Sequence, residues 1–176
     1  MRKFLLSIWE VVEVIIVAAA SIFVIYRFIA QPFLVQGASM EPNFSDGNYL
    51  IVDEVTYRFK EPLRGEVIVF RNPTNESEFY IKRIIGLPGE RAVIKEDSVF
   101  INGKQLEEIY LPNDIKFNNN IDTALKSDEY FVMGDNRLHS FDSRSWGPLK
   151  RDKIIGAVRV RFWPPTKLEL FTGVSN

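Results

Sequence analysis

The chain contains no cysteine and only one histidine, His139, among its 176 residues. The absence of cysteine excludes disulfide bonds, a thiolate nucleophile and cysteine-ligated zinc, and one histidine cannot form a histidine-rich metal site. Any catalysis must therefore use serine, lysine, aspartate or glutamate side chains. We expect no cofactor.

An excess of charge of one sign is also absent. The 22 lysine and arginine residues are balanced by 23 aspartates and glutamates, so the chain lacks the basic bias that is typical of nucleic-acid-binding domains. We accordingly expect no nucleic-acid partner. The apolar share, 46% of residues, is large enough for a buried core, and the length predicts one domain with an appended segment.

The longest uncharged apolar run lies near the N-terminus, at residues 14–26. As a helix this run would rise only about 20 Å, less than the roughly 30 Å hydrocarbon core of a bilayer. The predicted crossing therefore extends from about Leu5 or Ile8 to Ile29, and we assign residues 1–31 to a cytoplasmic tip and a single transmembrane anchor. A cleaved signal peptide and a buried amphipathic helix are the alternatives. Cleavage after Ala20 would leave an apolar N-terminus, which favours an uncleaved anchor.

The charges that flank this run predict its orientation. Arg2 and Lys3 precede it, and only Arg27 closely follows it. Short flanks rich in positive charge stay on the cytoplasmic side of a membrane. We therefore predict a single-pass protein of the cell membrane, with the lipid bilayer as a partner. The N-terminus would lie in the cytoplasm and residues 32–176 on the extracytoplasmic side.

Residues 32–176 have the pattern of a mainly β domain. Runs rich in β-branched and aromatic residues predict strands at residues 49–52, 66–70, 79–85, 92–94, 98–101, 130–133 and 157–162. Asn102 and Gly103 predict a type I′ hairpin turn. Such closely spaced strands are typical of a coiled sheet or a partly closed barrel. The polar residues 107–127 predict a long loop or a small insertion, for which the sequence indicates no role.

Ser39 lies between the apolar run and the first predicted strand. A serine hydroxyl becomes a nucleophile only when a base takes its proton. His139 is the one candidate base for a Ser-His-Asp triad, although it lies in a polar, turn-rich stretch. Lys82 is the alternative base, because it interrupts an apolar strand and shares a face with Tyr80 and Ile84, where burial lowers the pKa of an amine.

Both features also have structural interpretations. Lys82 and Arg83 could protect an edge strand from aggregation. The polar residues 134–147 could be a loop whose side chains support its own backbone. The residues taken singly favour these interpretations, and they leave the catalytic ones open.

Four stretches, in this order along the chain, together resemble the type I signal peptidases. They are residues 37–44, which begin Gly-Ala-Ser-Met-Glu-Pro, and residues 64–70, 80–90 and 134–147. Any one stretch would be a weak signal. The ordered set covers nearly the whole chain and is similar to the short bacterial members of that family.

The resemblance implies a membrane-bound serine endopeptidase that removes signal peptides from exported preproteins. Ser39 matches the nucleophile and Lys82 the general base of a Ser-Lys dyad. Ser140 matches the serine that positions the lysine amine, and Asp142 and Arg144 match the charged pair that stabilises the loop around it. The oxyanion hole would include the backbone N–H of Ser39.

The resemblance also implies a substrate groove, to which an extended preprotein adds as a β-strand. The residues that match groove positions are Met40, Phe44, Tyr80 and Ile81. Small residues would be preferred at the first and third positions before the cut. Gly37 stands where some members have a serine that donates a second oxyanion hydrogen bond, so that donor is absent or replaced.

Two other functions are compatible with the same sequence. One is a related Ser-Lys peptidase with a different substrate, such as a self-cleaving repressor or a pilus-protein processor. The other is a membrane-tethered β module that binds exported proteins without cutting them. The presence of both Ser39 and Lys82 counts against the second. The sequence makes no prediction about the oligomeric state.

Overall fold

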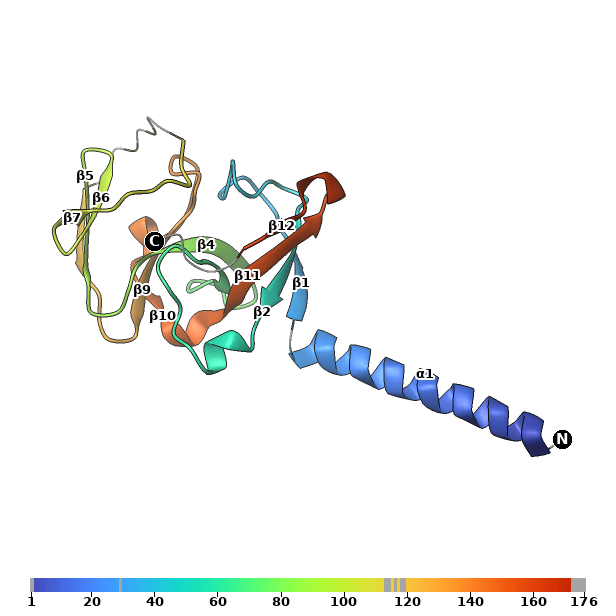
Figure 1. Ribbon diagram of the computed structural model, residues 1–176. Coiled ribbons are helices and arrows are strands. Elements are labelled where there is room, and N and C mark those ends of the chain that lie inside the picture. The colour runs from blue at the N-terminus through green and yellow to red at the C-terminus, as the bar shows by residue number, and fades with distance from the viewer. Residues whose placement is uncertain (1, 29, 113–114, 116, 118–119, 172–176) are drawn as a thin grey trace.

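The computed structural model describes residues 2–28, 30–112, 115, 117 and 120–171, which form a long N-terminal helix and a β-rich body (Figure 1). The helix, α1 (Arg2–Phe28), projects away from the body. Of its side chains only those of residues 8–23 are described, and all of them are exposed. Among the described residues no helix is long and apolar enough to cross a membrane. The predicted transmembrane span is therefore not confirmed by the fold.

The larger sheet has eight strands, all paired antiparallel. Its order is β1 (Ala30–Leu34), β2 (Tyr49–Asp53), β11 (Ile154–Trp163), β3 (Val67–Arg71), β4 (Phe79–Gly86), β9 (Glu129–Met133) and β10 (Leu149–Lys150), with β12 (Glu169–Leu170) also paired to β11. The strand that joins the β1–β2 hairpin to the β3–β4 hairpin is thus β11, which comes late in the chain.

The larger sheet is open. Within the part of the chain that the structure describes, no pairing joins the edge strands β1 and β10. Closure into a barrel requires such a pairing, and β10 is only two residues long, so it offers little backbone for it. The strands therefore do not form a closed barrel, and this finding leaves the predicted coiled sheet or partly closed barrel as a prediction.

A smaller four-stranded sheet packs beside the first. Its order is β7 (Lys104–Gln105), β6 (Ser98–Ile101), β5 (Arg91–Lys95) and β8 (Ile121–Ala124). Asn102 and Gly103 join β6 to β7 with φ values of 51° and 81°, as a type I′ turn requires. β8 lies inside the predicted loop of residues 107–127, so that loop is shorter than predicted. Four residues, half-buried and exposed in alternation, are too few to give a clear strand pattern.

Strand β4 separates two of the three apolar clusters of the body. Ile84 packs into one with Phe70 and Tyr130, whereas Ile85 packs into another with Phe131, beneath the smaller sheet. This follows from the alternation of side chains along a strand. The third cluster lies under the β1–β2 hairpin. Short helical turns complete the fold: η1 (Thr56–Arg58), α2 (Ser143–Trp146), η2 (Arg151–Lys153) and η3 (Pro165–Lys167).

The two halves of β4 differ in their pairing. β9 pairs with residues 83, 84 and 86. In the described structure the first half, residues 79–82, pairs only with β3. One edge of β4 is therefore unpaired beside Lys82.

Candidate active site

Ser39 and Lys82, 43 residues apart in sequence, are in direct contact. Ser39 lies in the turn that follows β1, and Lys82 is on β4. The Nζ atom of Lys82 donates hydrogen bonds to Ser39 Oγ at 2.7 Å and to the carbonyl oxygen of Ile81 at 2.8 Å. Only 4% of Lys82 is exposed to solvent. The fold thus places a buried amine against a hydroxyl group.

The surroundings of Lys82 favour its neutral form. Burial lowers the pKa of Lys82 from 10.5 to about 8, although the carboxylates of Asp142 and Asp135 oppose the change. The nearby guanidinium of Arg144 lowers it further. A neutral amine is a base, so at neutral or slightly alkaline pH an appreciable fraction of this lysine can accept a proton.

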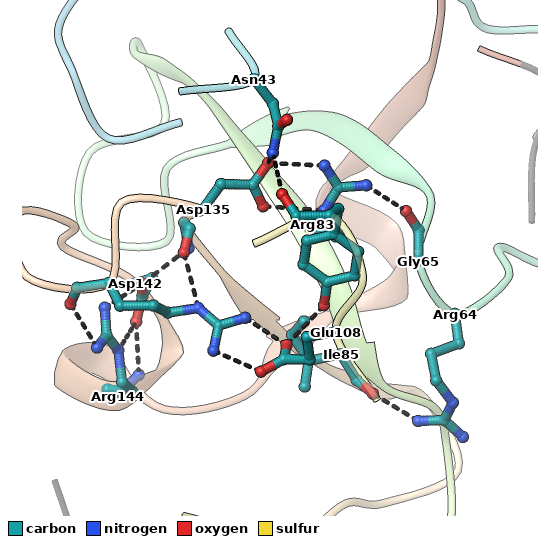
Figure 2. A network of polar contacts seen from close by, with 12 residues as sticks. Asn43, Arg64, Gly65, Arg83, Ile85, Glu108, Asp135, Asp142 and Arg144 are labelled. Atoms are coloured by element: carbon teal, nitrogen blue, oxygen red, sulfur yellow. Dashed lines mark hydrogen bonds and ion pairs between the residues drawn. The ribbon is translucent and has the colours of Figure 1, made fainter. Parts of the chain in front are cut away.

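The loop of residues 134–144 is closed by one buried carboxylate, that of Asp142. It accepts hydrogen bonds from the backbone of Gly134 at 2.9 Å and from two guanidinium nitrogens of Arg144, each at 2.8 Å (Figure 2). Burial alone would raise the pKa of Asp142, but these donors outweigh it and hold the pKa below its ordinary value. Arg144 also donates to the carbonyl of Arg137 at 2.7 Å, which fixes the middle of the loop.

The same loop is hydrogen-bonded to the turn that contains Ser39. The backbone N–H of Asn136 donates to the Ser39 carbonyl at 3.1 Å, and its side chain donates to the Ala38 carbonyl at 3.0 Å. At Gly134 a Cβ atom would approach both the Ser39 carbonyl and Ser140 Oγ far more closely than real Cβ atoms allow. Only glycine fits this position. Sequence reasoning assigned no role to Gly134 because its constraint arises from residues distant in the chain.

A second buried carboxylate, Asp135, connects the strand of the base to the turn of the serine. Arg83 donates to it through Nε at 2.9 Å and Nη2 at 2.6 Å, and Asn43 donates through Nδ2 at 2.8 Å (Figure 2). Arg83 follows Lys82 in β4, and Asn43 lies four residues after Ser39. The alternation of side chains predicts that Arg83 faces away from Lys82, but it does not identify the partner.

No contact in the described structure tests the predicted role of Ser140, which is to position the Lys82 amine. Its Oγ atom is buried and has no hydrogen-bond partner among the described residues. The hydroxyl lies close enough to the Asp142 carboxylate to help lower that pKa, but no hydrogen bond of good geometry forms between them. The two described hydrogen bonds of Lys82 Nζ go to other residues.

A cavity of about 360 Å³ opens over Ser39 and Lys82. Residues 33–39 line one side and residues 79–82 the other, so Tyr80 and Ile81 are part of its wall. Met40 and Phe44, also predicted to face substrate, are buried in the apolar cluster under the β1–β2 hairpin instead. Their contact with substrate stays a prediction, since the turn directs both side chains into the core.

His139 lines the same cavity together with Phe141. In the described structure no hydrogen bond joins His139 to Ser39, whose Oγ atom accepts from Lys82. The backbone N–H of Gly37 donates to Asp46 at 2.7 Å, so it is not free to serve as a second oxyanion donor. Within the described residues no group of three or more histidine, aspartate and glutamate side chains could hold a metal ion.

Comparison with known proteins places the chain in a family. Residues 8–163 match the family model described as signal peptidase, peptidase S26. A probable signal peptidase I-2 of Synechocystis is 38% identical over 84% of this chain and 70% of its own length. A signal peptidase I of Bacillus amyloliquefaciens is 37% identical over 89% and 86%.

A solved structure agrees with the sequence comparisons. The crystal structure of a signal peptidase I from Enterococcus faecalis aligns with a TM-score of 0.50 and 32% sequence identity. The alignment covers 56% of this chain and 97% of the other. On this combined evidence the chain belongs to the signal peptidase family, peptidase S26.

Proposed function

We propose that this protein is a serine endopeptidase that removes N-terminal signal peptides from exported preproteins, with Ser39 as nucleophile and Lys82 as general base. The observation that carries the proposal is the 2.7 Å hydrogen bond between Lys82 Nζ and Ser39 Oγ at the base of a cavity. Family membership and relatives named signal peptidase I support the choice of substrate.

In the first half of the reaction, neutral Lys82 takes the proton of the Ser39 hydroxyl as Oγ attacks the scissile carbonyl carbon. The carbonyl oxygen becomes an oxyanion, which the backbone N–H of Ser39 would stabilise. That N–H has no hydrogen-bond partner in the described part of the chain. The ammonium of Lys82 then gives its proton to the leaving amine, and the peptide bond breaks. The mature protein departs, and the signal peptide stays attached to Ser39 as an ester.

In the second half, a water molecule attacks this ester. Lys82 takes a proton from the water and returns one to Ser39 Oγ as the signal peptide leaves. We propose that Ser140 Oγ holds the protonated amine, because it is buried without a partner and an ammonium has three donors. Asp142 and Arg144 would keep the loop that carries Ser140 in place.

The substrate would bind as an added β-strand along the unpaired edge of β4. Residues 79–82 offer that edge on one side of the cavity, and residues 33–38 offer backbone groups on the other. A strand in this position passes over Ser39. The side chains before the cut would point into the cavity of about 360 Å³, and the preference for small residues stays a prediction.

We further propose that α1 attaches the enzyme to the cell membrane in a single pass, with the β-rich body on the extracytoplasmic side. α1 has 27 residues, and its described apolar side chains are exposed, among them Trp9, Val14 and Phe23. An exposed apolar helix of this kind needs a covering phase. The bilayer that holds the signal peptide would supply it.

Cleavage of a preprotein tests the catalytic proposal. Full-length Ser39→Ala and Lys82→Arg should each lose at least about a thousandfold in rate. Arginine keeps the charge but cannot act as a base. Lys95→Arg, at an exposed lysine of β5, is the matched control and should cleave normally. N-terminal sequencing of the product identifies the cut, and normal cleavage by Lys82→Arg would show that the assignment of the base is wrong.

Cell fractionation tests the attachment. The full chain should resist extraction from membranes by alkaline carbonate, whereas a variant that lacks residues 1–28 should be released. Equal behaviour of the two would contradict the proposed anchor. Protease added outside intact cells should digest the β-rich body, and its protection would reverse the proposed orientation.

A further inference from the structure

The segment Glu108-Ile109-Tyr110 contacts the residues that surround Ser39 and Lys82 but does not line the cavity. The sequence indicated no role for it. We call these three residues the clasp. Glu108 pairs through both carboxylate oxygens with Arg137, and one of these contacts, Nη1 to Oε2, measures 2.8 Å. The Arg137 side chain is fully buried. It also donates through Nε to the Gly134 carbonyl at 3.1 Å.

Tyr110 makes the other contacts of the clasp. Its hydroxyl donates to Glu108 at 2.6 Å, which orients the carboxylate toward Arg137. The guanidinium carbon of Arg83 lies 4.0 Å from the centre of the Tyr110 ring. The Tyr110 carbonyl accepts a hydrogen bond from Asn43 Nδ2 at 2.9 Å.

The clasp therefore contacts three segments that are far apart in sequence. Through Asn43 it reaches the turn of the nucleophile, and through Arg83 it reaches the strand of the base. Through Arg137 it reaches the loop of residues 134–144, where Gly134 packs closely against the Ser39 carbonyl. Figure 2 shows dashed contacts from Asp135 to Arg83 and Asn43, whereas the contacts of Glu108 run to Arg137 and Tyr110.

We propose that the clasp is a positioning element of the peptidase, which holds the nucleophile turn, the base strand and the 134–144 loop in the arrangement that catalysis needs. This inference rests on the proposed function of Ser39 and Lys82. Glu108 and Tyr110 touch neither the substrate cavity nor the reacting atoms. They act through Arg137, Arg83 and Asn43.

The physical reason lies in the burial of Arg137. A guanidinium without contact to water needs a counter-charge, and loss of one partner of a buried pair leaves the other uncompensated. Without the Glu108 carboxylate, Arg137 would move toward water and take the Gly134 carbonyl with it. Gly134 is packed against Ser39, so the shift would reach the nucleophile. Displacements of about 1 Å at reacting groups reduce rates by up to about a hundredfold.

The test compares two neighbouring carboxylates of the full-length enzyme. Glu108→Gln removes the charge at nearly constant size. Glu107→Gln makes the same change at an exposed residue that has no ion pair with any described residue. We expect Glu108→Gln to lower kcat on a preprotein by about tenfold with KM changed less than about twofold, and Glu107→Gln to leave both constants unchanged.

A double-mutant cycle on kcat separates positioning from general stability. If the pair acts as a unit, Arg137→Gln combined with Glu108→Gln should lose no more activity than the worse single variant. Tyr110→Phe, which keeps the ring and the carbonyl but loses the hydroxyl, should lose less kcat than Glu108→Gln. All rates are measured well below each variant's melting temperature and per folded molecule.

Three results would overturn the proposal: unchanged kcat in Glu108→Gln, a rise in KM alone, or additive losses in the cycle. Ser39→Ala is assayed in parallel. Cleavage by Ser39→Ala would reject the proposed function itself, whereas its inactivity beside a fully active Glu108→Gln would reject only the role of the clasp.

Discussion

Two ion pairs with the same geometry have different roles in this protein. Arg83 and Asp135 meet at 2.6 Å behind the active site, with side chains 12% and 0% exposed. Arg91 and Asp122 meet at 2.5 Å across the smaller sheet, with side chains 64% and 51% exposed. The exposed pair contributes little to the stability of the fold, because water and ions screen the attraction between its charges. The buried pair cannot lose one partner without leaving a charge in the interior.

The regions around these pairs differ in the same way. The core beneath the smaller sheet consists of apolar side chains. The region behind Ser39 instead buries five polar or charged residues, namely Lys82, Asp135, Arg137, Asp142 and Ser143. Apolar packing is enough to hold the smaller sheet. The catalytic region must also hold an amine whose pKa is lowered by burial, against the opposing effect of the Asp142 and Asp135 carboxylates.

Of the variants that compare these two regions, the largest difference is expected between alanine substitutions at two closely packed glycines. Gly134→Ala should reduce cleavage more than about a hundredfold, because the new methyl group displaces the Ser39 carbonyl and Ser140. Gly86→Ala places a methyl group 2.8 Å from Leu125 and 3.0 Å from Phe131, under the smaller sheet. It should lower the melting temperature but leave kcat per folded molecule unchanged. Equal kcat in the two variants would remove the distinction between the regions.

The next largest difference is expected between the carboxylates of the buried and the exposed ion pair, Asp135 and Asp122. Asp135→Asn should destabilise the protein by about 3–5 kcal/mol, since Arg83 loses its buried counter-charge, and should reduce cleavage strongly. Asp122→Asn should leave denaturant unfolding and activity unchanged. A similar loss of stability in both variants would show that burial does not separate the two pairs.

The dependence of activity on pH should reflect Lys82. Its pKa of about 8 predicts that kcat/KM rises about tenfold per pH unit below that value and levels off above it. The sign follows from the mechanism, because only the neutral amine takes the serine proton. A flat profile between pH 6 and 9, with the preprotein itself unchanged, would contradict Lys82 as the base.

The same lysine should affect stability with a definite sign. Its folded pKa of about 8 lies below the ordinary 10.5, so the unfolded chain binds more protons between these values and stability rises with pH across that window. Below pH 8 the whole penalty, roughly 3 kcal/mol at most, is present. Lys82→Met should therefore unfold at higher denaturant than the wild type at pH 6, and the difference should shrink above pH 8. Lys95→Met controls for the lost charge.

The smallest expected effect is at His139. It lines the cavity but forms no hydrogen bond with Ser39 in the described structure. His139→Ala should therefore retain kcat within about threefold, as expected of a side chain outside the proton path. Complete loss of cleavage would revive the Ser-His-Asp interpretation.

The sequence predicted the parts of this molecule that depend on local pattern. The runs that became β2, β3, β4 and β9 alternate or are continuously apolar over enough residues to be recognised. β8 was hidden because it is short and half-exposed. The open form of the larger sheet depends on which edges meet, and local pattern carries no information about that.

The residues of the candidate site also fall into those that the sequence predicted and those that it did not. The motifs indicated Ser39 and Lys82 as a pair, and the structure places their reactive atoms 2.7 Å apart. Gly134, Asp135 and Glu108 could not be assigned a role, because each acts through a contact with a distant segment. The sequence does not indicate whether the partner of an aspartate or glutamate is water or a buried guanidinium.

The position of β11 in the larger sheet has a consequence for synthesis. Ser39 follows the first strand of one hairpin, β1–β2, and Lys82 belongs to another, β3–β4. The strand between them, residues 154–163, leaves the ribosome more than a hundred residues after Ser39 has been made. A nascent or truncated chain without β11 has no strand to connect the two hairpins. Proteolytic activity should therefore arise only when the body is nearly complete, so that unfinished molecules are not active proteases.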